Sequence, residues 1–154
     1  MTQEEKELLR KDLCARLPYG VKAKVLNEDI LRYDYYSKEG GFIKGIENIN
    51  DGLFVIECTK DGYVLSYDEF KPYLFPLSSL TEEQRNYISK LLIDTQNEFP
   101  PYGELNAKGC DNLFVCSIKQ ANVFINYCLA NHLDINGLIE KGLAIDATGL
   151  NIYC

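Results

Sequence analysis

Tryptophan is absent from the chain, and its 154 residues include a single histidine and a single methionine. Histidine is the side chain whose ordinary pKa lies nearest neutrality, so one copy leaves little acid–base machinery for catalysis at neutral pH. Long apolar runs are missing as well, since none approaches the ~18 residues of a membrane-spanning helix. We therefore expect neither a histidine-based enzyme nor a membrane protein.

Positive charge is also scarce. The chain has 16 lysines and arginines against 23 aspartates and glutamates, which gives a net charge of −7. Such a charge repels a phosphate backbone. Lys22 and Lys24 alternate along one predicted strand, which indicates a solvated face rather than a basic patch. The predicted short helix, Gly142 and hairpin near the C-terminus have the shape of a winged-helix fragment, but residues 97–154 contain no arginine. We expect no nucleic-acid partner.

An export signal is not visible at the start of the chain. The first residues, MTQEEKELLRKDL, place acids where a signal peptide has a basic region and then an apolar run. The six cysteines would suit three disulfides in a small secreted protein, but this chain is larger than such proteins. We expect a cytoplasmic protein in which most cysteines serve as small core residues.

Helix starts are clearly marked. Hydrophobic residues make up 46% of the chain, a globular composition. Three times, a hydroxyl residue is followed three positions later by Glu or Gln, the spacing of a capping box. The pairs are Thr2 with Glu5, Thr81 with Gln84, and Ser117 with Gln120. They predict three helices, and Leu17-Pro18 predicts the end of the first.

Apolar and polar residues alternate between the first two helices. Gly40-Gly41, Asp51-Gly52 and Asp61-Gly62 supply turns between these runs. The pattern predicts five short strands, at residues 21–25, 31–35, 42–46, 53–58 and 63–67. The 11 tyrosines and 7 phenylalanines are typical of β structure. We expect a small five-stranded SH3-like antiparallel barrel, because closure removes exposed edges.

The rest of the chain predicts helices closed by a hairpin. Asp134 caps a brief helix over residues 134–141, and Gly142 ends it in the left-handed conformation. Residues 143–145 and 150–153 then form a C-terminal β-hairpin. The predicted fold class is α+β, with residues 1–77 as helix plus barrel and residues 78–154 as the helical part.

The stretch KPYLFPLSSLTEEQ, residues 71–84, places apolar side chains around Pro72 and Pro76. The prolines bias the residues before them toward extended conformations. The segment is interpreted as a covered joint between barrel and helix. A partner-binding patch is the alternative, because exposed apolar residues are costly unless something buries them.

This stretch, KDLCARLPYGVKAKV (residues 11–25) and HLDINGLIEKGLAID (residues 132–146) together resemble an uncharacterised family of small proteins. Its members are encoded in gut Bacteroides genomes and in their phages and prophages. The resemblance covers roughly a third of the chain. It implies an intracellular accessory protein of a bacterium or phage, and it carries over no activity, cofactor or functional residue.

Two groups of residues suggest a metal-binding or catalytic site. Cys110, Cys116, Cys128 and His132 are the residue types of a zinc site, but they lack the Cys-x2-Cys spacing that makes such a site specific. Cys128 and His132, four apart on one helical face, also combine with Asp134 as a nucleophile, base and orienting acid. Packing of Cys128 in an apolar helix stripe is the preferred interpretation.

Tyrosines of the barrel suggest a second kind of site. Tyr33, Tyr63 and Tyr67 are among the rings that a small barrel can gather into a cage for a cationic side chain. Ordinary core and surface tyrosines are the preferred interpretation.

We expect a non-enzymatic, cytoplasmic protein-interaction or accessory module, of possible phage origin, with no cofactor and an unidentified protein partner. The candidate interaction residues are Tyr33, Tyr63, Tyr67, Tyr73 and Phe75. The alternative is a metal-stabilised or thiol-dependent enzyme centred on Cys128 and His132, and a self-assembling structural component is a third hypothesis. The sequence leaves the oligomeric state open.

Overall fold

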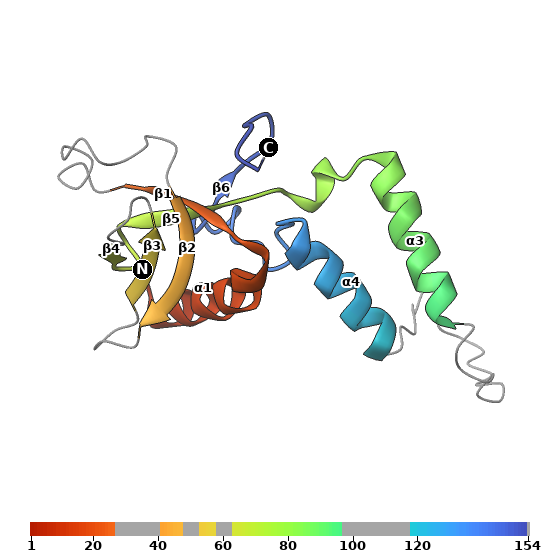
Figure 1. The fold of residues 1–154 in the computed structure, drawn as a ribbon, viewed down its shortest axis with the longest axis horizontal. Helices are drawn as coiled ribbons and strands as arrows, with labels where there is room; N and C mark the ends of the chain where they lie inside the picture. The colour runs from red at the N-terminus through yellow and green to blue at the C-terminus, as the bar shows by residue number, and fades with distance from the viewer. Residues whose placement is uncertain (27–40, 48–52, 58–62, 97–117, 154) are drawn as a thin grey trace. The chain divides into compact units, whose positions relative to one another are not determined.

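The computed structural model describes residues 1–26, 41–47, 53–57, 63–96 and 118–153 (Figure 1). Within them the chain is a mixed α+β protein of two compact units. The first comprises Met1–Ser79 with Leu129–Cys154, and the second comprises Leu80–Cys128.

The first unit contains helix α1 and the strands. Its elements are α1 (Gln3–Arg16), a 3-10 helix (Leu17–Tyr19), β1 (Lys22–Val25), β2 (Gly41–Glu47), β3 (Leu53–Glu57), β4 (Tyr63–Leu65), β5 (Phe70–Leu74), a second 3-10 helix (Leu77–Ser79) and β6 (Ile145–Asp146). The second unit contains the helices α3 (Glu82–Gln96) and α4 (Ile118–Ala130), except that the last two residues of α4 are assigned to the first unit.

The strands form an open sheet in the order β4-β3-β2-β1-β5-β6 (Figure 1). Neighbouring strands are antiparallel except β5 and β6, which are parallel. The predicted closed barrel is therefore wrong. After β4 the chain crosses to pair β5 with β1, and β6 then adds beyond β5, so β4 and β6 remain separate edges.

The strand that sequence reasoning missed is β5. It occupies the segment interpreted as a joint, whereas the strand predicted at residues 31–35 lies outside the described residues. Pro72 lies opposite Ala23 and is fully buried. Proline cannot donate to the ladder and is rarely found inside a sheet, so it argued against a strand here. The burial of Pro72 and of its apolar neighbours on β5 outweighs the loss of that one donor.

Helix α1 begins and ends as predicted. The Thr2 hydroxyl accepts a hydrogen bond from the Glu5 backbone, and the Glu5 carboxylate accepts one from the Thr2 backbone, which completes the capping box. The helix ends at Arg16, and Gly20 follows with φ +70°. Leu9 and Leu13 are fully buried against Ala23, Val25 and Phe70, so the main core lies between α1 and one face of the sheet.

The C-terminal segment differs from the predicted helix and hairpin. Residues 134–141 form turns, in which the Asp134 carboxylate accepts hydrogen bonds from the backbones of Leu138 (2.9 Å) and Ile139 (2.8 Å). Gly142 has the predicted left-handed conformation, with φ +69°. The hairpin is wrong, because β6 pairs with β5 and residues 150–153 form no strand. Alternation over so few residues cannot identify the pairing partner.

The second unit is helical where it is described. The Thr81 hydroxyl accepts from the Gln84 backbone and the Gln84 side chain accepts from the Thr81 backbone, which confirms the second capping box. Ser117, the predicted cap of the third helix, lies outside the described residues, and α4 begins at Ile118. Tyr87 of α3 and Tyr127 of α4 have ring centroids 5.7 Å apart. No helix in the described ranges is long and apolar enough to cross a membrane.

Candidate interaction surface

The two central strands divide their side chains between two faces. On β1, Ala23 and Val25 are buried in the core against α1, and Lys22 and Lys24 alternate with them. On β5, Lys71 alternates with Phe70 and Pro72, which are both fully buried. Because successive side chains of a strand point to opposite faces, the three lysines lie on the face away from α1.

The register brings two lysines together. Lys24 lies directly opposite Lys71 across β1 and β5. Directly opposed residues have Cβ atoms about 5 Å apart, and like charges at that spacing destabilise the strand pair. Among the described residues, neither lysine forms an ion pair. The pair therefore concentrates positive charge on two adjacent strands of an acidic chain.

An exposed aromatic ring lies next to these lysines. Phe42 on β2 is the cross-strand partner of Lys22 and is 42% exposed. The Lys22 ammonium lies 5.0 Å from the centre of the Phe42 ring, a cation–π contact. A Cβ atom at Gly20 would lie 3.6 Å from the ring, so the ring also packs over that glycine. Phe42 is thus held in place while one side of it faces water.

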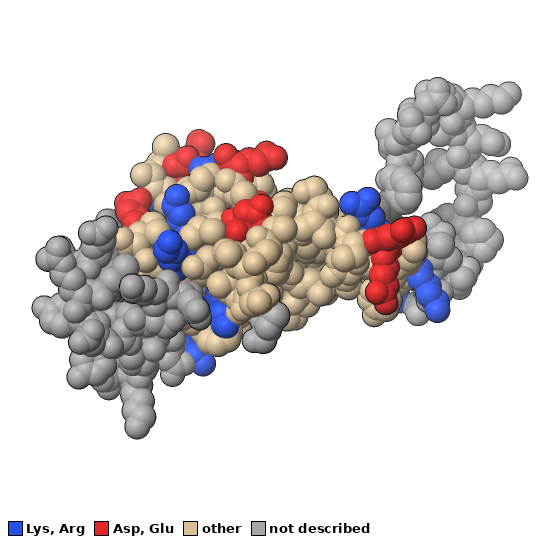
Figure 2. Space-filling model, turned by 90° about the horizontal axis from the view of Figure 1, so that it is seen from above, with Lys and Arg blue, Asp and Glu red and all other residues tan. Residues whose placement is uncertain are grey.

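We call Lys22, Lys24, Phe42 and Lys71 the outer-face patch. It extends over three adjacent strands, β2, β1 and β5. Figure 2, seen from above the view of Figure 1, shows basic side chains in a row on the sheet-bearing part of the molecule. The patch combines exposed aromatic surface with two lysines, Lys24 and Lys71, that pair with no acid among the described residues.

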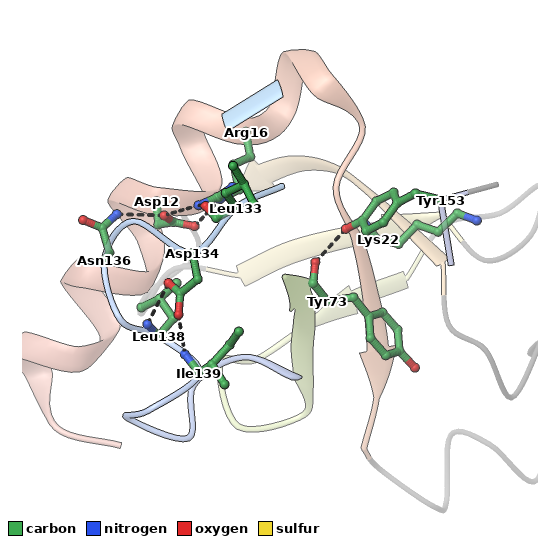
Figure 3. Close-up of polar contacts among 10 residues, drawn as sticks. All are labelled: Asp12, Arg16, Lys22, Tyr73, Leu133, Asp134, Asn136, Leu138, Ile139 and Tyr153. Atoms are coloured by element: carbon green, nitrogen blue, oxygen red, sulfur yellow. Dashed lines mark hydrogen bonds and ion pairs between the residues drawn. The ribbon is translucent and has the colours of Figure 1, made fainter. Parts of the chain in front are cut away.

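Tyr153 links two of the strands that carry this patch. Its hydroxyl donates to the Tyr73 carbonyl at 2.7 Å and accepts from the Lys22 backbone N–H at 3.2 Å (Figure 3). The hydroxyl therefore bridges β1 and β5. Burial raises the pKa of Tyr153 to about 12, so the hydroxyl keeps its proton and remains a donor. The Lys22 ammonium also donates to the Ile152 carbonyl.

His132 packs against the face of the Tyr153 ring. The two rings stack with centroids 3.8 Å apart and planes 12° from parallel. Burial, together with the smaller effect of the nearby Arg16 charge, lowers the pKa of His132 to about 4. The imidazole is therefore neutral at neutral pH. Its Nδ1 is buried and makes no hydrogen bond within the described structure. His132 thus supports Tyr153.

A buried ion pair fixes α1 to the segment that carries His132. The Arg16 guanidinium donates to both carboxylate oxygens of Asp12, at 2.6 and 2.9 Å, and to the Leu133 carbonyl at 2.8 Å (Figure 3). The Asn136 amide donates to the same carboxylate at 2.8 Å. Both charged side chains are fully buried. These contacts connect α1 to the segment that carries His132.

Three of the predicted interaction residues have side chains that the structure describes, and none of these three is fully exposed. Tyr33 lies outside the described residues, and Tyr63 begins β4 with a side chain that is not described. Tyr67 and Tyr73 are buried, at 4% and 5% exposure. Phe75 is half-buried, with its ring centroid 5.9 Å from that of Tyr153. The aromatic cage stays a prediction.

The predicted metal and thiol residues are not brought together by the described part of the chain. Cys110 and Cys116 lie outside it, and Cys128 is fully buried in α4. His132 lies beyond the end of α4 and has φ 55°, so the helical spacing used to pair it with Cys128 does not apply. Among the described residues no group of three His, Cys, Asp or Glu could hold a metal ion. The enzyme alternative stays a prediction.

Sequence reasoning missed Lys71, Phe42 and Tyr153. The alternation of Lys22 and Lys24 was visible, and it correctly indicated one face of a strand. Their neighbour Lys71 follows only from the pairing of β1 with β5, which requires recognising a proline-containing strand. The position of Tyr153 depends on a long-range contact that local pattern does not encode.

Comparison with known proteins adds no constraint. A scan against protein-family models found no match, and searches of curated proteins and of solved structures found no protein significantly similar to this chain. The resemblance to the Bacteroides and phage family stays a prediction.

Proposed function

We propose that the protein is a non-enzymatic, cytoplasmic protein-interaction module that binds its partner through the outer-face patch. The observation that carries the proposal is the pairing of Lys24 with Lys71, without an ion-pair partner in the described structure, beside the exposed ring of Phe42. We propose that the module is an accessory protein of a bacterium or phage.

The energetics of the patch favour a binding role. Opposed like charges cost stability in the free protein, and a partner that neutralises them recovers this cost. An aromatic ring that is already held in place loses little conformational entropy on binding, and rings of this kind often dominate interface energies. The cation–π contact and the packing over Gly20 hold Phe42 in this way.

The titratable groups near the patch support a structural role for them. His132 and Tyr153 are buried, with pKa values displaced away from neutrality to about 4 and about 12. Asp12 and Arg16 neutralise each other in the interior. A general acid or base needs a pKa near the working pH, and neither His132 nor Tyr153 has one.

Site-specific photo-crosslinking tests the proposal. A photoreactive phenylalanine analogue replaces Phe42 in one variant and Lys11, whose side chain is 71% exposed on α1, in a control. In a lysate of the cells that express the protein, we expect discrete protein adducts from position 42 and none of the same mass from position 11. Equal adducts from both positions, or none from position 42, would contradict the proposal.

A further inference from the structure

We infer that the outer-face patch binds an extended, acidic protein segment that presents carboxylates to Lys24 and Lys71 and an apolar side chain to Phe42. This inference rests on the proposed function and adds the chemistry of the partner. It follows from the charges of the patch and from the spacing of its three strands.

The positive charge available to a partner comes from two of the three lysines. The Lys22 ammonium already donates to the Ile152 carbonyl and lies over the Phe42 ring, so its role is to hold that ring. Lys24 is exposed and Lys71 is half-buried, and neither has a carboxylate partner among the described residues. Partial burial strengthens a charge pair relative to open water.

The spacing of the patch fits an extended chain. Neighbouring strands lie about 5 Å apart, and residues two positions apart on a strand lie about 7 Å apart. Lys24 is two positions from Lys22, which faces Phe42 across the β1–β2 pair. Phe42 and the lysine pair are therefore separated by roughly 8 to 13 Å. Side chains two or four positions apart on one side of an extended segment span the same range.

The boundaries of the patch limit the extent of the acidic segment. On β3 the register position opposite Phe42 is held by Glu57, so the sequence supplies no positive charge at that position. Phe42 therefore suits an apolar residue at one end of the contact, with acids toward β5. The expected pattern is one apolar residue with glutamate or aspartate two and four positions from it.

A nucleic acid fits this patch less well than a protein segment. A phosphate backbone carries charge at every nucleotide and is held by runs of basic residues. Here two lysines lack an acidic partner among the described residues, while the whole chain carries −7. A segment with few carboxylates matches that number and meets less long-range repulsion.

Fluorescence anisotropy with defined probes tests the inference. The first probe is a short labelled peptide with one phenylalanine and glutamates two and four residues from it. The second replaces each glutamate by glutamine, and the third is a labelled single-stranded oligothymidylate. We expect the glutamate peptide to bind about tenfold more tightly than the glutamine peptide, with affinity falling as salt is raised.

Matched variants locate the binding. Lys24→Gln/Lys71→Gln removes the opposed charges, and Lys11→Gln/Lys90→Gln removes the same charge from exposed positions on α1 and α3. We expect the first variant to lose the preference for glutamate and the second to keep it. Circular dichroism checks that both variants are folded.

Each other outcome overturns the inference. Equal affinity for the two peptides, with binding lost in Phe42→Ala, would refute the acidic partner while leaving the proposed module in place. Tighter binding of oligothymidylate through the same lysines would refute a protein partner. No binding of any probe would refute the inference, and the crosslinking experiment separately decides the proposed function.

Discussion

At the scale of single residues, Tyr153 replaces a direct contact between two strands. Its hydroxyl satisfies the Lys22 N–H and the Tyr73 carbonyl together. Buried backbone groups left without a partner cost free energy comparable to a lost hydrogen bond. One hydroxyl thus adds a link between β1 and β5 next to the ladder that places Lys24 opposite Lys71.

Tyr153→Phe keeps the ring and removes this bridge. We expect the free energy of unfolding to fall by about 1–3 kcal/mol, because two backbone groups lose their partner. Urea denaturation measures the change. Tyr19→Phe, at a ring that is 39% exposed, is the control and should leave stability unchanged. Equal stability of the Tyr153 variant and the wild type would show that the bridge contributes nothing.

His132 makes the stability of the fold depend on pH. Its folded pKa of about 4 lies below the ordinary value of 6.5, so the unfolded chain binds a proton more readily. Its contribution is therefore fully present above pH 6.5 and is lost as pH falls toward 4. We expect wild-type stability to decline over this range by up to about 3 kcal/mol more than that of His132→Gln.

Unfolding midpoints measured across that pH range, for both proteins, check this expectation. Tyr153, whose ring stacks on the imidazole, has a pKa raised to about 12 by burial and keeps its proton over this range. Parallel curves for the two proteins would mean that His132 titrates normally in the folded state.

At the scale of elements, the helix starts were predictable and one interior strand was not. The capping boxes at Thr2 and Thr81 are local, since both partners lie within one helical turn, and each is present as expected. The position of β5 depends on tertiary burial that outweighs a proline. The parallel pairing of β6 joins residues far apart in sequence, and a two-residue strand carries no alternation strong enough to reveal it.

The Asp12–Arg16 pair joins α1 to the turn at Leu133 and Asn136. Asp12→Ala leaves a buried guanidinium without its carboxylate, so we expect a loss of about 3–5 kcal/mol. Asp12→Leu combined with Arg16→Met should recover much of that loss, because neither charge then remains buried. Chemical denaturation compares the three proteins. A double variant less stable than Asp12→Ala would mean that the pair is needed for more than charge balance.

At the scale of the whole molecule, the sequence predicted an α+β protein with an alternating region but not its open topology. It also predicted an interaction role and placed it on rings that the structure buries, such as Tyr67 and Tyr73. The reason is general: alternation identifies a face, but which strands share that face follows from pairing. Lys24 and Lys71 become neighbours only through the β1–β5 register.

The central claim is that the opposed charges of the outer-face patch lower the stability of the free protein, and that binding of an acidic segment removes this destabilisation. Thermal unfolding of wild type and Lys71→Gln, with and without the glutamate peptide, tests it most directly. We predict that Lys71→Gln melts at a higher temperature than wild type when free, by an amount equivalent to roughly 0.2–1 kcal/mol. The peptide should raise the melting temperature of wild type more than that of Lys71→Gln, which keeps only one of the two opposed lysines. A lower melting temperature for Lys71→Gln, or an equal peptide effect on both proteins, would contradict the claim.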